Sequence, residues 1–271
     1  MDNTFILELQ EPQYFRSVRK HKKLLNLTAK AIKLFNSHNF YLKLNFKSDA
    51  LNHYYEIRNP KKLEFKEKRL QGGMTSIEQG INIYHLLCQT IQNNIPGDIV
   101  ELGCYEGITA ILIQKTLDQF NSDKIIHVFD SFEGLPDKSE KDGDTIFKKG
   151  SCSAQKINLI ENFEKHNAKL PIIHEGWFKD KLPKELPGKI CFAHLDGDFY
   201  SSIMESLECV YPRLSKDAIV IIDDYCDPQI HNVNNILPGV KRATDEFLMN
   251  KPEKLVVLIA GNDCHAYFRK E

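Results

Sequence analysis

The stretch Ala193-His194-Leu195-Asp196-Gly197-Asp198-Phe199-Tyr200 is an apolar run that stops abruptly in carboxylates, and Ile221-Ile222-Asp223-Asp224-Tyr225 repeats this pattern. An apolar run bounded in this way is typical of a buried β-strand. In an open α/β sheet, buried strands deliver the residues that follow them to a crevice at their carboxyl ends, where ligands bind. Both stretches therefore predict an α/β fold with acidic groups gathered at one edge of its sheet.

The four carboxylates in these stretches predict a cation site. Acidic side chains that meet in one crevice repel one another unless a cation or a proton offsets their charge. Hard oxygen ligands in this number suit Mg²⁺ or a similar ion such as Mn²⁺. The residues concerned are Asp196, Asp198, Asp223 and Asp224.

The chain around these stretches alternates between predicted strands and predicted helices, which indicates a mainly parallel, doubly wound sheet. The helices include one that starts at a predicted capping box of Thr75 and Glu78 and runs to about Gln92. The other predicted helices are 107–120, 153–166, 201–214 and 240–249. The predicted strands are 98–102, 124–129, 171–174, 189–195, 218–222, 255–260 and 266–268.

The first residues of the chain differ in composition from the rest. Residues 15–39 are rich in Lys and Arg, with apolar residues at helical spacing, which predicts an amphipathic basic helix. Residues 40–46 fit either a strand or more helix, and 59–68 are charged like a linker. We therefore expect an N-terminal helical extension over residues 1–71, followed by an α/β domain over residues 72–271.

Composition excludes several classes of protein. Lys and Arg number 36 against 37 Asp and Glu, so no charge excess favours nucleic acid as a partner. The seven cysteines show no paired CxxC spacing and are predicted to be reduced core thiols of a cytoplasmic protein. There is no signal-peptide pattern at the N-terminus and no apolar run of membrane-spanning length.

A glycine loop upstream of the acidic stretches predicts a nucleoside site. Glu101, Gly103 and Gly107 follow the first predicted strand as ExGxxxG, and Asp130 ends the next strand. An acid in that place can accept hydrogen bonds from two ribose hydroxyls. The GxGxxG pattern of a dinucleotide site is absent, and Glu101 is available to bind a cationic group of the ligand. This combination matches S-adenosylmethionine (SAM), and Thr75 and Ser131 are also assigned to the cofactor. The alternative is that the glycines only shape a turn and Asp130 caps a helix.

Five blocks, taken in order, resemble the macrocin O-methyltransferase family. They are 95–103 (IPGDIVELG), 130–136 (DSFEGLP), 176–180 (GWFKD), 195–200 (LDGDFY) and 223–225 (DDY). The resemblance covers about residues 72–270. It implies a seven-stranded, Rossmann-like methyltransferase sheet and a SAM- and Mg²⁺-dependent enzyme that methylates sugar hydroxyls of natural products. It also implies Asp196, Asp223 and Asp224 as metal ligands and Asp198 as the catalytic base.

Two other functions remain open at this point. A metal beside SAM would also serve a catechol-like phenol, and an aromatic-lined pocket would favour that acceptor. A non-catalytic scaffold that uses its basic N-terminal helix is the other alternative, although a dead site would have no reason to keep mutually repelling acids. The expected partner is a small-molecule hydroxyl acceptor, a sugar in the first reading, without nucleic acid or a membrane span. A homo-oligomer is left open.

Overall fold

The computed structural model describes residues 42–46, 53–57, 74–231, 236–260 and 263–271. The chain divides into two compact units, Met1–Lys68 and Arg69–Glu271. In the first unit, β1 (Leu42–Phe46) and β2 (His53–Ile57) form an antiparallel pair. Residues 40–46 were predicted as either strand or helix, and the described part of that stretch, 42–46, is a strand. The predicted basic helix over 15–39 and the charged linker over 59–68 lie outside the described residues.

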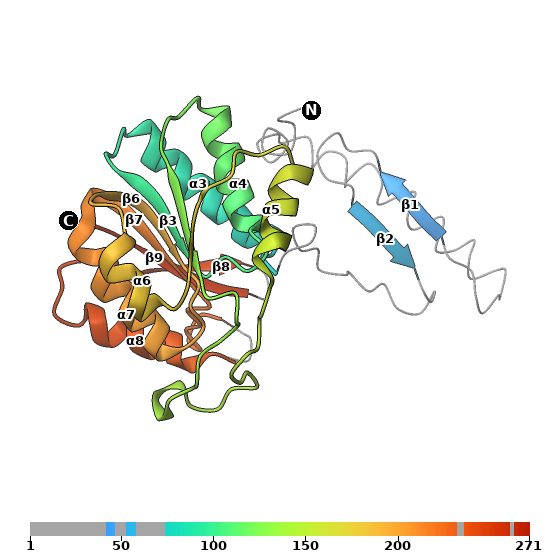
Figure 1. Cartoon of the computed structure of the whole chain (residues 1–271). Helices are drawn as coiled ribbons and strands as arrows, with labels where there is room; N and C mark the ends of the chain where they lie inside the picture. Colours follow the sequence, from blue (N-terminus) through green and yellow to red (C-terminus); the bar gives the residue numbers. More distant parts are fainter. Residues whose placement is uncertain (1–41, 47–52, 58–73, 232–235, 261–262) are drawn as a thin grey trace. The chain divides into compact units, whose positions relative to one another are not determined.

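The second unit is built on a seven-stranded sheet, as the resemblance implied (Figure 1). The strand order is β5-β4-β3-β6-β7-β9-β8. Neighbours from β5 to β7 are parallel, and β9 is antiparallel to both β7 and β8. The strands are β3 (Asp98–Leu102), β4 (Ile126–Asp130), β5 (Ile172–Glu175), β6 (Ile190–Leu195), β7 (Leu214–Asp223), β8 (Val256–Ala260) and β9 (Asp263–Arg269).

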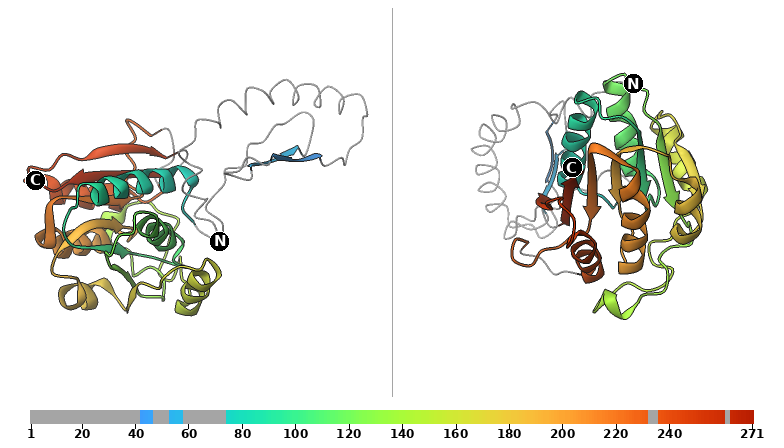
Figure 2. Two further views of the ribbon diagram at one scale, coloured as in Figure 1. Left: turned by 90° about the horizontal axis from the view of Figure 1, so that it is seen from above. Right: turned by 90° about the vertical axis from the view of Figure 1, so that its left-hand side faces the viewer.

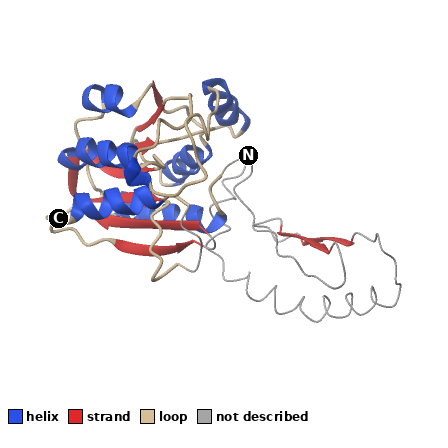
Figure 3. Ribbon diagram, turned by 90° about the horizontal axis from the view of Figure 1, so that it is seen from below, coloured by secondary structure: helices blue, strands red, loops and turns tan. Residues whose placement is uncertain are grey.

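Helices cover both faces of this sheet, so the unit has three layers (Figures 1 and 3). One face carries α3 (Ile77–Gln92), α4 (Ile108–Gln119) and α5 (Lys156–Lys165). The other carries α6 (Phe178–Glu185), α7 (Tyr200–Val210) and α8 (Pro238–Leu248). Two short 3-10 helices, η1 (Glu140–Asp142) and η2 (Tyr211–Arg213), complete the described elements. Figure 2 shows the same sheet and its covering helices from two further directions.

The central strands are buried because they are sandwiched between the two helical layers. Every residue of β6 is buried, and so are the last six residues of β7. These strands are near-continuous apolar runs, as expected of parallel strands with both faces covered. Their burial places the acidic residues that follow them at the carboxyl edge of the sheet.

Several predicted boundaries differ from the structure. Ser76, not Thr75, caps α3: its side chain accepts the N–H of Gln79, and the Gln79 side chain accepts the N–H of Ser76. The helix predicted from 153 begins at Lys156. The helix predicted over 201–214 ends at Val210, because the chain turns through η2 into β7. Helix α6 was not predicted, since Pro183 within it reads as a helix breaker.

No helix among the described residues is long and apolar enough to cross a membrane.

Candidate active site

The site lies where the direction of the sheet's winding reverses. From β3 the chain moves outward to β4 and β5, and then returns to place β6 on the other side of β3. This switch point opens a crevice at the carboxyl ends of β3 and β6, which is where doubly wound sheets bind ligands. This crevice contains a cavity of about 830 Å³, a volume in the range of small-molecule sites.

The glycine loop after β3 is shaped by its closeness to β6. Gly103 has φ +87°, and a Cβ added to it would overlap the carbonyl oxygen of Asp196. Asp196 in turn donates its N–H to the Leu102 carbonyl at 2.8 Å. Gly103 lines the cavity, whereas Gly107 does not. Gly107 instead begins α4 at φ +79°, where a Cβ would lie 2.8 Å from the Leu159 side chain, so its role in this structure is packing.

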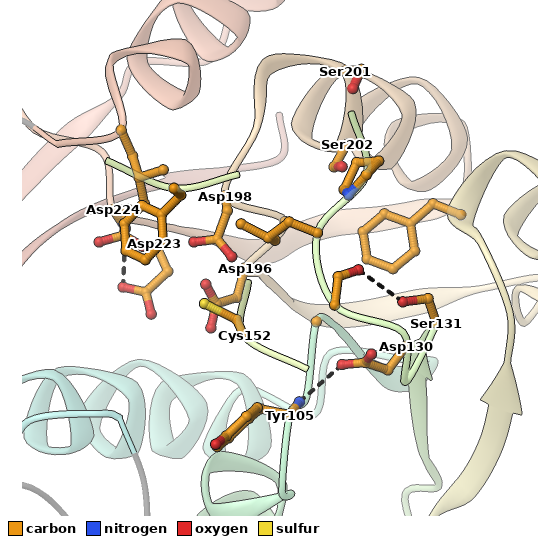
Figure 4. Close-up of a pocket in the computed structure, with 18 of the residues that line it drawn as sticks. Tyr105, Asp130, Ser131, Cys152, Asp196, Asp198, Ser201, Ser202, Asp223 and Asp224 are labelled. Atoms are coloured by element: carbon orange, nitrogen blue, oxygen red, sulfur yellow. Dashed lines mark hydrogen bonds between the residues drawn. The ribbon is translucent and has the colours of Figure 1, made fainter. Parts of the chain in front are cut away.

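Asp130 organises the same loop from the end of β4. One of its carboxylate oxygens accepts the N–H groups of Cys104 and Tyr105, both at 2.9 Å, and the other accepts the N–H of Phe132 at 2.8 Å. Figure 4 shows the bond from Tyr105. Tyr105 and Phe132 adopt positive φ values, 47° and 56°, which bulky residues rarely do. The carboxylate thus holds two strained turns in place and also lines the cavity.

Glu101 does not face the cavity, contrary to the prediction that it awaits a cationic ligand. It pairs in register with His194 of the neighbouring strand β6, and the His194 Nδ1 lies 3.1 Å from the Glu101 Oε1. Both side chains are 1% exposed, and Glu101 is not among the lining residues. Burial raises the pKa of Glu101, although His194 opposes the shift. The partner of Glu101 in this structure is therefore the His194 imidazole.

Three carboxylates converge at the ends of β6 and β7. Ligand oxygens of Asp196, Asp198 and Asp224 all lie within 4.8 Å of one another, and all three side chains are partly buried (Figure 4). Asp198 and Asp224 have positive φ values, 62° and 54°. Aspartate tolerates this conformation better than most residues do, and strained backbone is often found at functional sites.

The mutual repulsion of these carboxylates favours a bound cation. Burial, followed by the negative charges of Asp223 and Asp198, raises the pKa of Asp196 well above its usual range. Burial, with Asp223 and Asp130, raises the pKa of Asp198 to about 7, although a hydrogen bond with Asp224 opposes the shift. A divalent ion would relieve this repulsion, and an all-oxygen donor set suits Mg²⁺ or Mn²⁺. The residues present therefore fit the metal that the resemblance implied.

Asp223 lines the same cavity but is held differently. Its Oδ1 accepts the side-chain N–H of Gln79 at 2.7 Å, and its Oδ2 lies 3.6 Å from the His194 Nε2. Burial acts to raise the pKa of Asp223, but the proximity of His194 prevails and lowers it. Asp223 thus has the His194 imidazole beside it, and it lies outside the group of mutually close oxygens formed by Asp196, Asp198 and Asp224.

The other predicted contacts lie at the cavity wall. Thr75 and Ser131 both line it; the Thr75 hydroxyl is 2.7 Å from that of Thr109, and the Ser131 hydroxyl donates to the Gly134 carbonyl at 3.0 Å. Sequence reasoning missed several lining residues, which lie on helices α3 and α7, within the motif loops after β3 and β4, and in the segment before α5. They include Gln79, Tyr105, Leu135, Phe147, Cys152 and Glu205.

A doubly wound sheet with a glycine loop at its switch point and a carboxylate cluster beside it defines a nucleoside-binding α/β protein with a candidate metal centre. Comparison with known families makes the class specific. The family model described as macrocin-O-methyltransferase (TylF) matches residues 33–252. The chain therefore belongs to the macrocin O-methyltransferase family.

Individual relatives agree with this membership. The chain is 32% identical over 183 residues to a demethyldecarbamoylnovobiocin O-methyltransferase of Streptomyces niveus, a match that covers 64% of this chain and 66% of the relative. It is 30% identical over 173 residues to 8-demethyl-8-(2,3-dimethoxy-alpha-L-rhamnosyl)-tetracenomycin-C 4'-O-methyltransferase of Streptomyces olivaceus, covering 59% and 66% respectively. The match thus spans just under two thirds of these relatives.

Among solved structures, the O-methyltransferase NovP superposes with a TM-score of 0.60 at 26% identity. The superposition covers 73% of this chain and 81% of NovP. The architecture described above is therefore the one that the resemblance implied.

Proposed function

We propose that this protein is a SAM-dependent, divalent-metal-dependent O-methyltransferase that acts on a hydroxyl of a sugar or glycosylated natural product. The observation that carries the proposal is the convergence of Asp196, Asp198 and Asp224 in one cavity with Gly103 and Asp130. A nucleoside subsite and an acidic cluster that share a cavity support transfer from a nucleoside cofactor to a metal-bound acceptor. Family membership and the rhamnosyl acceptor printed in one relative's name support the acceptor class.

The cofactor would lie along the loop after β3. Gly103 has no side chain there, so the backbone can approach a ligand closely. Asp130 keeps accepting capacity after its three backbone hydrogen bonds, because two carboxylate oxygens offer about four lone-pair sites. Thr75 and Ser131 would complete this subsite. Glu101 and Gly107 would act behind it, by supporting His194 and the start of α4.

The acceptor would lie against the acidic cluster. When bound, SAM supplies an activated methyl group and a divalent cation lowers the pKa of the hydroxyl that it contacts. Asp196, Asp223 and Asp224 are proposed to hold the cation, and Asp198 to take the hydroxyl proton. Proton removal by a placed carboxylate contributes roughly 10²–10⁴-fold to a rate. Holding the acceptor oxygen in line with the methyl group can supply about 7–11 kcal/mol more.

The cavity wall favours a second acceptor class. Tyr105, Phe147, Trp177 and Phe178 line it and offer apolar ring surface. Such a wall suits a catechol-like phenol, or an aromatic aglycone that carries the sugar. A panel of acceptors must therefore include both types.

The test is methyl transfer by the full-length protein from SAM with a radiolabelled methyl group. The acceptors are glycosylated natural products and catechols, offered with Mg²⁺, with Mn²⁺ or with EDTA. We expect transfer to a glycoside that EDTA abolishes and that Asp224→Asn abolishes. Asp217→Asn is the matched control, because Asp217 lies in the first half of β7, away from the cavity lining, and also has a positive φ. Full activity in EDTA would remove the metal from the proposal, and SAM binding without transfer to any acceptor would favour a non-catalytic role.

A further inference from the structure

A second group of metal-ligating side chains lies next to the active site but does not line it. Cys226 and His231 belong to the loop after β7, and Cys264 belongs to β9. Ligand atoms of the three residues lie within 4.8 Å of one another. All three are buried, with exposures of 3%, 8% and 6%. This group could not be predicted from local sequence patterns, because Cys264 is far along the chain from the other two.

The hydrogen bonds of the His231 ring define its tautomer. Its Nε2 lies 3.0 Å from the Leu258 carbonyl oxygen, which can only accept, so Nε2 carries the proton. Metal-bound histidines usually donate their second ring N–H to a carbonyl or carboxylate in this way. The lone pair is then on Nδ1, which accepts the N–H of Asp227 at 3.0 Å. A cation would take the place of that single hydrogen bond.

The donor set selects a different metal from that of the active site. Two thiols and an imidazole are soft or borderline ligands, which suit Zn²⁺ and disfavour Mg²⁺. None of the seven cysteines, all of which lie among the described residues, forms a disulfide. We propose that Cys226, His231 and Cys264 supply three ligands to a Zn²⁺ site that is separate from the carboxylate cluster.

A Zn²⁺ ion at this site would stabilise one wall of the active-site cavity. Cys226 follows Asp224 by two residues, and Cys264 follows Asp263, which lines the cavity. His231 already contacts β8 through Leu258. An ion held by these three ligands would therefore tie the loop after β7 to the antiparallel pair β8 and β9. The inference does not depend on the methyl-transfer reaction.

The experiment uses Co²⁺ in place of Zn²⁺, because Co²⁺ bound to thiolates gives sulfur-to-metal charge-transfer absorption. Full-length protein, reduced and freed of metal, is titrated with Co²⁺ and then with Zn²⁺. We expect one equivalent of Co²⁺ to produce the absorption and Zn²⁺ to bleach it. The Asp196→Asn variant should keep the signal, since it alters only the carboxylate cluster, and Cys264→Ser should lose it. Cys209→Ser is the matched control, as Cys209 is a half-buried thiol on α7, and it should keep the signal.

A second readout protects the test against misfolding of the variants. In the unaltered protein, Zn²⁺ should slow alkylation of Cys226 and Cys264 while leaving alkylation of Cys209 unchanged. The proposal is overturned if the unaltered protein gives no charge-transfer absorption, or if Cys264→Ser keeps it. It is equally overturned if Zn²⁺ leaves the alkylation of Cys226 and Cys264 unchanged.

Discussion

The Nδ1 atom of His194 lies 3.1 Å from Glu101, and the Nε2 atom of the same ring lies 3.6 Å from Asp223. Burial by itself would lower the pKa of His194, but the carboxylates on both sides prevail and raise it well above its usual range. The imidazole of His194 thus lies between a carboxylate at the end of β3 and one at the end of β7, and this placement favours its protonated form. It also holds Asp223 at the edge of the active site.

Replacement of His194 should change stability in a pH-dependent way. A group whose pKa is raised by folding contributes stability that is fully present below its unfolded pKa, about 6.5 for histidine, and is lost as the pH rises through the folded pKa. His194→Gln should therefore be most destabilising at or below about pH 6.5, by roughly 3–5 kcal/mol as for other broken buried pairs. The difference from the unaltered protein should shrink at higher pH.

Urea unfolding between pH 6 and 9, with EDTA present, measures this difference. His166→Gln is the control, because burial lowers the pKa of His166 and its contribution is lost as the pH falls instead. A destabilisation by His194→Gln that is constant with pH would mean that His194 is not charged in the folded protein.

Gly103 should tolerate no side chain. An alanine there would overlap the Asp196 carbonyl oxygen and would have to adopt φ +87°. Gly103→Ala should lower the melting temperature and weaken SAM binding, because β3 and β6 must separate to make room. Gly188→Ala is the matched control, since nothing lies within 4 Å of its added Cβ, and its effect should stay within about 0.5 kcal/mol. Normal calorimetric SAM affinity in Gly103→Ala would contradict the placement of the cofactor at this loop.

The elements that could be predicted from the sequence are those whose signal is local. The buried parts of β6 and β7 are apolar runs, and each run is directly followed by aspartates in the chain. Once the two strands pair in parallel, these carboxylates meet in one crevice. The Pro at the start of α8 is a local signal as well. By contrast, α6 is short, polar and contains Pro183, so its helical state depends on packing against the sheet.

The parts of the site that could not be predicted depend on long-range register. The position of Glu101 at the end of β3 was predictable, but its partner His194 is set by the pairing of β3 with β6. The same holds for Cys226 and Cys264, which meet only because β9 turns back beside β7. A motif fixes which residues end a strand and not which neighbour each side chain faces.

Asp130 should matter for the fold of the loop as well as for the cofactor. Asp130→Ala removes the acceptor of three backbone N–H groups. We expect a lower melting temperature without any ligand and SAM affinity weakened by about 1–3 kcal/mol, the usual cost of leaving polar groups unpaired. Asp137→Ala is the control: Asp137 lines the same cavity but forms only an exposed ion pair with Lys149, worth about 0–1 kcal/mol. A lower melting temperature with unchanged SAM affinity in Asp130→Ala would leave Asp130 a structural role alone.

The roles of Asp198 and Asp223 can be separated by isosteric variants. Asp198→Asn keeps the shape of the side chain but removes the proton acceptor. If Asp198 is the base, turnover should fall by roughly 10²–10⁴-fold. The affinities for SAM and Mg²⁺ should change little, and the loss should appear in kcat more than in KM, because the proton moves only on the way to the transition state. If Asp223 is a ligand, Asp223→Asn should instead weaken Mg²⁺ binding in calorimetry.

The pH profile gives an independent readout of the same assignment. A base acts in its deprotonated form, so kcat of the unaltered protein should rise with pH and level off once Asp198 is ionised. Without a cation, the pKa of Asp198 is raised to about 7, and a bound cation favours the carboxylate, so the midpoint of the rise should lie at or below about 7. Asp198→Asn should lack this rise. Because the Asp198 oxygens lie within ligand reach of Asp196 and Asp224, loss of Mg²⁺ binding in this variant would make Asp198 a ligand. Near-normal turnover would exclude both roles.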